Sequence, residues 1–339
     1  MPGPNITVAI CTHNNADMLE RALAKLARQR VAPATTWELV VVDNRSTDRT
    51  PETLHTWSER GVFPEMRVVR EERLGLSNAR RAALAVAQAD LIAFIDDDCF
   101  LHPGWIAEAV AFARSRPRAG AFGGRVRIKW MSPPTQLGRA SEWALARQDR
   151  GNRQVKLPDR GGVPLVGAGL VVRRDALDES GWIERGRQMG RTGKALTSGD
   201  DAEISFRIRA AGWELWYTPT MKIDHVLPAW RSERAYLGRL HRAIGMTLPH
   251  IWILGGVYRR TPLSVPFFAL VGLARAARKL LSALKYLVLG RMLQAEKRLM
   301  AAQQNFGCFL GAFALPPPEE EPPAPPRLLP FAQRAQPRT

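Results

Sequence analysis

Residues 91–98 read LIAFIDDD, an apolar run that ends in three consecutive aspartates. Five apolar residues between polar ones are typical of a strand buried in a parallel sheet. Three carboxylates at the end of a strand repel one another unless a cation is present, so we expect a hard divalent ion with oxygen ligands there. Asp96 and Asp98 project to the same side wherever the chain stays extended. The alternative interpretation is a solvated turn ahead of a helix that starts at Trp105.

Strands and helices alternate around this run. Strands are predicted at residues 6–10, 38–42, 67–70, 121–130, 163–173 and 213–218, and helices at 18–26, 50–57, 77–89, 105–114 and 202–211. This alternation predicts an α/β fold with a doubly wound, mainly parallel sheet. Ligands bind such sheets outside the carboxyl ends of the strands, where the polar clusters 12–15, 43–48 and 96–98 follow their strands.

Two common nucleotide-binding signatures are missing from the sequence. No G-x-G-x-x-G follows the first predicted strand, and no G-x-x-x-x-G-K-[ST] occurs anywhere in the chain. These absences argue against a dinucleotide-dependent enzyme and against a P-loop NTPase. A nucleotide bound to this sheet would therefore be held in a different way.

Six motifs occur in a characteristic order. They are VAICTHNN (8–15), ELVVVDNRSTDRT (38–50), GLSNARRAAL (75–84), LIAFIDDDCFLHPGW (91–105), VGAGLVVRR (166–174) and SGDDAEISFRIRAAGWELWYTP (198–219). In order and spacing they closely resemble the motifs of the family 2 glycosyltransferases of GT-A fold, over about residues 5–228. The chain departs from the common pattern at Arg81, where the family often has Asn, and at Asn44, where a second Asp is frequent.

The resemblance implies a nucleotide-sugar donor, most often a uridine diphosphate sugar, and a divalent cation, Mg²⁺ or Mn²⁺. Residues 96–98 take the place of the family's D-x-D motif. The implied metal ligands are Asp98, Asp96 and His225. The implied donor-binding residues, which receive the base, the ribose or the nucleoside, are Thr12, Asn14, Asp43, Arg80, Asp96 and Asp97.

Asp200 and Asp201 take the place of the family's Glu-Asp pair at the start of a helix. The resemblance makes Asp201 the general base, with Asp200 beside it, and in-line displacement would invert the anomeric centre. A helix N-terminus stabilises a carboxylate as the anion, which suits a base that accepts a proton from an incoming hydroxyl. The alternative is that both residues only cap the helix, for which Ser198 is also suited.

Acceptor features are less distinct in the sequence. The Q-x-x-R-W motif of the processive family members is absent, and residues 239–242 (RLHR) lie in its place, so we expect addition of a single sugar. Trp143 and Trp182 are candidates for stacking on an acceptor sugar or for simple burial. Residues 181–197, rich in Gly and Arg, are predicted to form a mobile loop.

The positive charge is concentrated near the C-terminus. The chain carries 49 Lys and Arg against 32 Asp and Glu, a net charge of +17, and residues 230–300 alone hold a surplus of 11. A helix predicted at 270–289 has Arg275, Arg278, Ser282 and Lys285 on one side and leucines on the other. Such a helix can lie in an anionic membrane interface, or it can pack on the catalytic domain with a solvated basic face.

The sequence predicts three regions. They are a GT-A domain at 1–228, a basic amphipathic helical region at 229–315 and a Pro-rich, disordered tail at 316–339, which has nine prolines in 24 residues. The N-terminus lacks the pattern of a secretory signal, and three scattered cysteines fit a reducing compartment. We therefore expect a cytoplasmic protein, peripheral on the cytoplasmic face of the membrane.

The predicted function is transfer of one sugar to a hydroxyl of a saccharide or lipid-linked acceptor, in cell-surface polysaccharide or glycoconjugate synthesis. A sugar-phosphate nucleotidyltransferase is the first alternative, although its Gly-rich signature after the first strand is absent. A basic nucleic-acid-binding protein is the second. Because the basic residues are not interleaved with aromatic ones, we expect no nucleic-acid partner.

Overall fold

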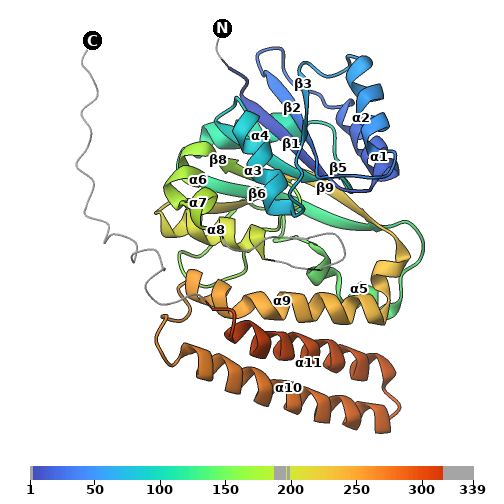
Figure 1. Ribbon diagram of the computed structural model, residues 1–339, viewed down its shortest axis with the longest axis vertical. Coiled ribbons are helices and arrows are strands. Elements are labelled where there is room, and N and C mark those ends of the chain that lie inside the picture. Colours follow the sequence, from blue (N-terminus) through green and yellow to red (C-terminus); the bar gives the residue numbers. More distant parts are fainter. Residues whose placement is uncertain (1–2, 187–195, 197–198, 316–339) are drawn as a thin grey trace, which may run out of the picture.

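The computed structural model describes residues 3–186, 196 and 199–315. Over these residues the chain forms a mixed α/β domain and, below it, a layer of three long helices (Figure 1). The predicted tail at 316–339 and most of the predicted loop at 181–197 lie outside the described residues.

One mixed sheet forms the centre of the domain. Its strands are β1 (Ile6–Thr12), β2 (Trp37–Asp43), β3 (Met66–Arg70), β4 (Leu91–Asp96), β5 (Cys99–Leu101), β6 (Ala119–Trp130), β7 (Val155–Lys156), β8 (Leu170–Arg173) and β9 (Glu214–Leu227). The order is β3-β2-β1-β4-β8-β6-β9-β5, with β7 paired to β9. The first four strands in this order are mutually parallel, and β8, β5 and β7 run antiparallel to their neighbours.

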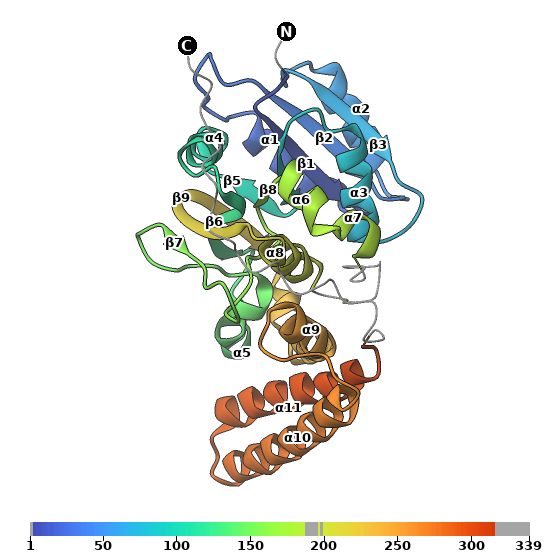
Figure 2. The ribbon, with the colours of Figure 1, turned by 90° about the vertical axis from the view of Figure 1, so that its left-hand side faces the viewer.

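Helices cover both faces of the sheet, as the predicted doubly wound fold requires (Figures 1 and 2). The helices α1 (Ala16–Leu26), α2 (Thr50–Glu59) and α4 (Trp105–Ser115) contribute to one apolar core, and α3 (Leu76–Val86), α6 (Arg174–Ser180) and α8 (Asp200–Ala210) to the other. Strand β1 lies between the two cores, with Ile10 in the first and Ala9 in the second. Burial on both faces explains why residues 8–11 of this strand form a continuous apolar run.

Three long helices form the layer below the sheet. They are α9 (Arg234–Leu254), α10 (Ser264–Val288) and α11 (Met292–Ala312), and α9 packs on α8 while α11 lies between α9 and α10. Glycines bring these helices close together: a Cβ on Gly307 would lie 2.1 Å from the carbonyl oxygen of Arg242. Among the described residues, no helix is both long enough and apolar enough to cross a bilayer.

The structure corrects the predicted elements in a few places. Residues 182–185 of the predicted loop form the short helix α7 (Trp182–Arg185). The N-cap of α8 is Gly199, whose φ of 101° suits glycine, and not Asp200, which is the first residue of the helix. The short pieces α5 (Gln136–Ala140), η1 (Glu142–Leu145) and η2 (Ala229–Ser232), like β5 and β7, were not predicted because they are too brief to show periodicity.

Candidate active site

The carboxyl ends of β1, β2 and β4 meet at one edge of the sheet. Thr12 is the register partner of Asp43, and Cys11 that of Asp96. Parallel pairing therefore gathers residues that are more than 80 positions apart in the chain. The candidate site is built at this edge, from the turn that follows each strand.

Asp97, the middle aspartate of the triplet, is turned toward β1. Its Oδ2 accepts a hydrogen bond from Thr12 Oγ1 at 2.7 Å, and its Oδ1 accepts one from Asn15 Nδ2 at 2.7 Å. Burial, followed by the charge of Asp98, raises the pKa of Asp97 to about 7. Asp97 thus joins the turn after β4 to the turn after β1, and two of the predicted donor-binding residues, Thr12 and Asp97, contact each other.

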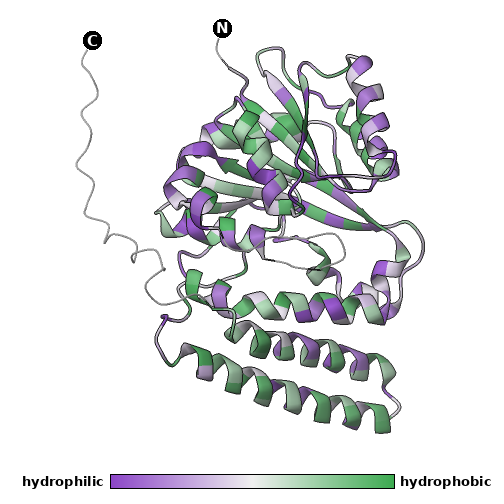
Figure 3. Cartoon of the chain, in the orientation of Figure 1, coloured by the Kyte–Doolittle hydropathy of each residue, from purple (hydrophilic) through white to green (hydrophobic). Residues whose placement is uncertain are grey.

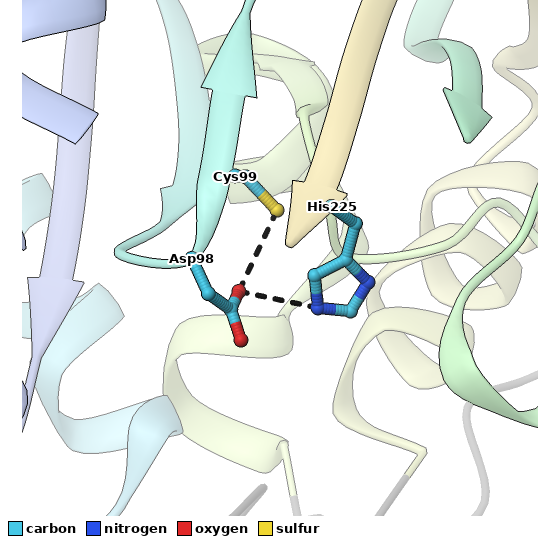
Figure 4. Close-up of side chains that lie close together, drawn as sticks. All are labelled: Asp98, Cys99 and His225. Carbon is cyan, nitrogen blue, oxygen red and sulfur yellow. Dashed lines mark hydrogen bonds and ion pairs between the residues drawn. The ribbon is translucent and has the colours of Figure 1, made fainter. Parts of the chain in front are cut away.

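Asp98 lies in a buried cluster with Cys99 and His225 (Figure 4). The antiparallel pairing of β5 with β9 sets Cys99 opposite His225. His225 Nε2 is 3.2 Å from Asp98 Oδ1, and Cys99 Sγ donates to the same oxygen over 3.7 Å. The structure therefore brings together two of the three predicted metal ligands, Asp98 and His225, over a separation of 127 positions.

The other ring nitrogen of His225 fixes its tautomer. Nδ1 lies 3.0 Å from the carbonyl oxygen of Leu145, and because a carbonyl can only accept, Nδ1 carries the hydrogen. The lone pair of a neutral ring then lies on Nε2, directed at the Asp98 carboxylate. Two electron-rich atoms at this distance require a proton or a cation between them.

A divalent cation fits this set of donor atoms. Imidazole with carboxylate is a ligand combination that binds Mn²⁺ and similar ions. Burial and the charge of Asp98 raise the pKa of Cys99 well above its ordinary value in the metal-free cluster. A soft cysteine sulfur is also not among the ligands that Mg²⁺ or Mn²⁺ prefers. Asp98 and His225 would hold the ion, and its remaining positions would be open to a ligand.

Arg231 supplies a positive charge to the same cluster. It lies in η2, directly after β9, and its Nη1 is 3.1 Å from Asp98 Oδ2. Its Nε is buried and has no hydrogen-bond partner among the residues that the structure describes. Arg231 was not predicted as a site residue, because no motif in the stretch LPAWRS indicates such a role. The one available signal was its position six residues after His225.

Asp96 lies apart from the metal-ligand cluster and faces the buried Arg80. The distance from Asp96 Oδ1 to Arg80 Nη2 is 3.9 Å, while Arg80 Nη1 donates to Asp200 Oδ2 at 2.6 Å. Burial opposes the charge of Arg80, but Asp200 and Asp96 outweigh it and raise the pKa of the guanidinium. Arg80 therefore joins the end of β4 to the start of α8.

Asp201, the second residue of α8, is held by two backbone N–H groups. Its Oδ2 accepts from Gly167 N at 2.8 Å and its Oδ1 from Ala202 N at 2.8 Å. Burial, reinforced by the charge of Asp200, raises the pKa of Asp201 to about 6, although Arg80 and both N–H groups act against it. This corrects the simple expectation from the helix N-terminus, which would lower the pKa. Burial is the larger effect here.

Gly167 has no room for a side chain between these charged groups. A Cβ there would lie 2.8 Å from Arg80 Nη2 and 3.3 Å from Asp201 Cβ. The lack of a side chain at Gly167 thus allows its backbone N–H to approach the Asp201 carboxylate.

The side chains of Asn14 and Asp43 form hydrogen bonds with the loop that follows β2. Asn14 Oδ1 accepts from Thr47 N at 2.7 Å, and Asp43 Oδ1 accepts from Ser46 N at 2.8 Å. Asp43 Oδ2 also pairs with Arg70 Nη1 at 3.1 Å. Both residues thus lie at the predicted edge of the sheet, where they order the loop that follows β2.

Comparison with known proteins identifies the chain. Residues 7–181 match the family described as Glycosyl transferase family 2. The chain belongs to this family. It is therefore a glycosyltransferase, and the nucleotidyltransferase and nucleic-acid-binding alternatives are set aside.

Individual relatives of this glycosyltransferase agree with the family. Glycosyltransferase AglE of Haloferax volcanii is 25% identical over 79% of this chain and 81% of its own length. Validoxylamine A glucosyltransferase of Streptomyces hygroscopicus subsp. limoneus is 34% identical over 33% of this chain, which spans only a quarter of that relative. Mannosyltransferase PcManGT of Pyrobaculum calidifontis, solved with GDP-Man and Mn²⁺, shares the GT-A fold, with a TM-score of 0.56, 20% identity, and coverage of 88% of this chain and 86% of that one.

The two tryptophans considered for sugar stacking differ in this glycosyltransferase. Trp182 is fully buried, with Arg81 over its ring at 4.7 Å, so it is not available to an acceptor. Trp143 is 53% exposed and contacts His241 edge-on. Arg81 also donates to the carbonyl oxygen of Ile183 at 3.0 Å, so the residue that departs from the family pattern holds α7 in place.

Proposed function

We propose that this glycosyltransferase moves one sugar from a nucleotide-diphosphate sugar to a hydroxyl of a saccharide or lipid-linked acceptor. The first donor to consider is a uridine diphosphate sugar. The transfer inverts the anomeric centre and uses a divalent cation, Mg²⁺ or Mn²⁺. The observation that carries the proposal is the placement of two carboxylates, Asp98 after β4 and Asp201 at the start of α8, on elements that Arg80 joins through Asp96 and Asp200. Asp98 lies with His225 in a cluster suited to a cation, and Asp201 lies at the start of α8 with a pKa near neutrality.

The proposed donor site follows the carboxyl edge of the sheet. Thr12, Asn14 and Asp43 lie at the ends of β1 and β2, where we place the nucleoside, and Asp96 with Arg80 lies next to them, where we place the ribose. Asp97 orders the turn between these parts. PcManGT holds both GDP-Man and Mn²⁺ in its complex, which supports a nucleotide-sugar donor and a divalent ion for this chain.

The proposed chemistry is a direct displacement. A bound divalent ion would act as a Lewis acid that neutralises the charge on the departing diphosphate. Arg231 adds a second positive charge next to Asp98. Asp201 accepts the proton of the acceptor hydroxyl as the new glycosidic bond forms, and Asp200, paired with Arg80, keeps the first turn of α8 in place.

The pKa of Asp201 sets an expected pH dependence. Because burial raises this pKa to about 6, the carboxylate is the base above that pH and is neutral below it. We expect kcat to fall about tenfold per pH unit below pH 6 and to level off above it. Initial rates measured across this range test the prediction. A rate that rises as the pH falls below 6 would exclude Asp201 as the base.

The stereochemical outcome tests the displacement itself. With an α-linked donor such as UDP-glucose and water as the acceptor, a single displacement releases β-glucose first. Proton NMR during the first minutes, before mutarotation, identifies the anomer. Release of α-glucose first would indicate retention and would overturn the inverting mechanism.

We also propose that the enzyme works in the cytoplasm, on the cytoplasmic face of an anionic membrane, in cell-surface polysaccharide or glycoconjugate synthesis. Cys11, Cys99 and Cys308 are all buried free thiols, which supports a reducing compartment. The basic helical layer below the sheet supports the membrane partner.

A further inference from the structure

Helix α10 packs on α11 through its small residues and not through its leucines. Its buried positions include Ala269, Gly272, Ala276 and Ala283. A Cβ on Gly272 would lie 2.7 Å from the backbone nitrogen of Phe309, so the two helices touch almost backbone to backbone. This close packing uses one face of α10 and leaves the rest of the helix outside.

The leucine face of α10 is consequently open to solvent. Leu270 is 71% exposed, Leu281 70% and Val288 80%. The exposed apolar side chains on this face of the helix are Leu270, Leu273, Leu280, Leu281, Leu284, Leu287 and Val288. Together with the turns at either end, residues 257–292 hold more than half of the large exposed hydrophobic side chains of the described chain, a concentration that marks an interaction surface. Figure 3 shows α10 as a mainly hydrophobic outer edge.

Basic residues run beside the leucines. Arg275, Arg278 and Lys285 are exposed and lie three or seven positions apart, on one stripe of the helix. No acidic residue occurs anywhere between Glu233 and Glu296. An apolar face flanked only by cations is complementary to a surface that is apolar inside and negatively charged at its boundary.

Aromatic side chains lie where the chain enters α10. Tyr258 and Phe267 are both exposed, and their rings contact each other with centroids 5.6 Å apart. Exposed tyrosine rings are enriched at the level of the lipid head groups, and Phe267 packs against the ring of Tyr258. They extend the leucine face toward the turn before the helix.

We propose that the α10 surface, defined as these seven apolar side chains with Arg275, Arg278 and Lys285, lies flat in the interface of an anionic lipid bilayer. The inference deepens the membrane partner of the proposed function and rests on it. A second copy of the chain is disfavoured as the occupant, because joining two such faces would set like charges against each other.

This docking fixes the orientation of the enzyme. Helix α10 is the outermost element on the side remote from β2 and β3, with α11 and then α9 between it and the sheet (Figures 1 and 2). The base-bearing start of α8 lies next to α9, since a Cβ on Gly199 would be 3.0 Å from Thr247 Cβ. The start of α8, which Arg80 joins to the carboxyl edge of the sheet, therefore lies on the side of the molecule that carries α9, α11 and α10 and faces the bilayer.

Flotation of the full chain with lipid vesicles tests the proposal. The vesicles are phosphatidylcholine alone, or phosphatidylcholine with phosphatidylglycerol. We expect the unmodified protein to float with the anionic vesicles. The double variant Leu270→Gln with Leu281→Gln should lose about tenfold in the partition coefficient. Arg275→Gln and Arg278→Gln should each lower the partition coefficient about fivefold. Val62→Gln, which replaces an exposed apolar residue directly after α2, at the end of the molecule opposite α10 (Figure 1), is the matched control and should float as the parent does.

Two further readouts separate the possible failures. Donor binding, measured by calorimetry without lipid, should be the same in the α10 variants as in the unmodified protein. If the unmodified protein did not bind a donor, that result would count against the proposed function and not against the docking. Light scattering after size exclusion reports the oligomeric state. A concentration-independent dimer that the leucine variants dissociate, or flotation unaffected by both pairs of substitutions, would overturn the proposal.

Discussion

Replacement of Asp201 by Asn should reduce kcat about a thousandfold while donor affinity stays within about threefold. The amide has the size of the carboxylate and can still accept from Gly167 N or Ala202 N, so the site keeps its shape. It cannot take a proton from an acceptor hydroxyl. Rates with saturating donor, and calorimetry with the same donor, measure the two quantities separately.

Asp178→Asn is the matched control for this experiment. Asp178 is an exposed carboxylate on α6, and its neutralisation should leave kcat unchanged. Full activity in Asp201→Asn would show that another group is the base.

Asp200→Asn is expected to act differently from Asp201→Asn, because it removes the charged partner of the buried Arg80. We expect it to lower the free energy of unfolding by about 3 kcal/mol.

Replacement of Asp98 by Ala should abolish the part of donor binding that depends on the divalent ion. Asp98 is the carboxylate that faces both His225 and Arg231, and its loss leaves both side chains without their carboxylate partner. We expect the donor affinity measured with Mn²⁺ to fall about a hundredfold and to equal the affinity measured with EDTA.

Asp159→Ala is the control for the loss of one negative charge. Asp159 lies in the loop after β7 and is 80% exposed in its side chain, so its loss should not change metal-dependent binding. If Asp98→Ala kept the difference between Mn²⁺ and EDTA, the ion would not be held at the cluster of Asp98 and His225.

Much of the fold was predictable because buried parallel strands have a distinct pattern. The runs at 6–10, 38–42 and 91–95 are short, mainly apolar and followed by polar turns, and each coincides with a strand of the sheet. The family motifs supplied the order of the remaining elements. What the pattern did not reveal were pieces as short as β5 and η2, which carry Cys99 and Arg231 into the site.

The site was predictable in its members but not in its contacts. The sequence named Asp96 and Asp98 as a pair on one side of an extended chain, yet the chain turns between β4 and β5, so Asp98 joins His225 while Asp96 faces Arg80. The pKa of Asp201 depends on burial, which no local motif reports. Likewise, the periodicity of α10 gave its apolar and basic sides, but only packing shows that a third side contacts α11.

The most direct test of the central claim is the product released from the donor. Purified protein is incubated with a panel of nucleotide sugars and Mn²⁺ or Mg²⁺, and the released nucleotide is identified by chromatography. We predict a nucleoside diphosphate, formed only with the ion present and lost in Asp201→Asn. Release of pyrophosphate, or no turnover with any donor together with salt-sensitive binding of DNA, would contradict the account.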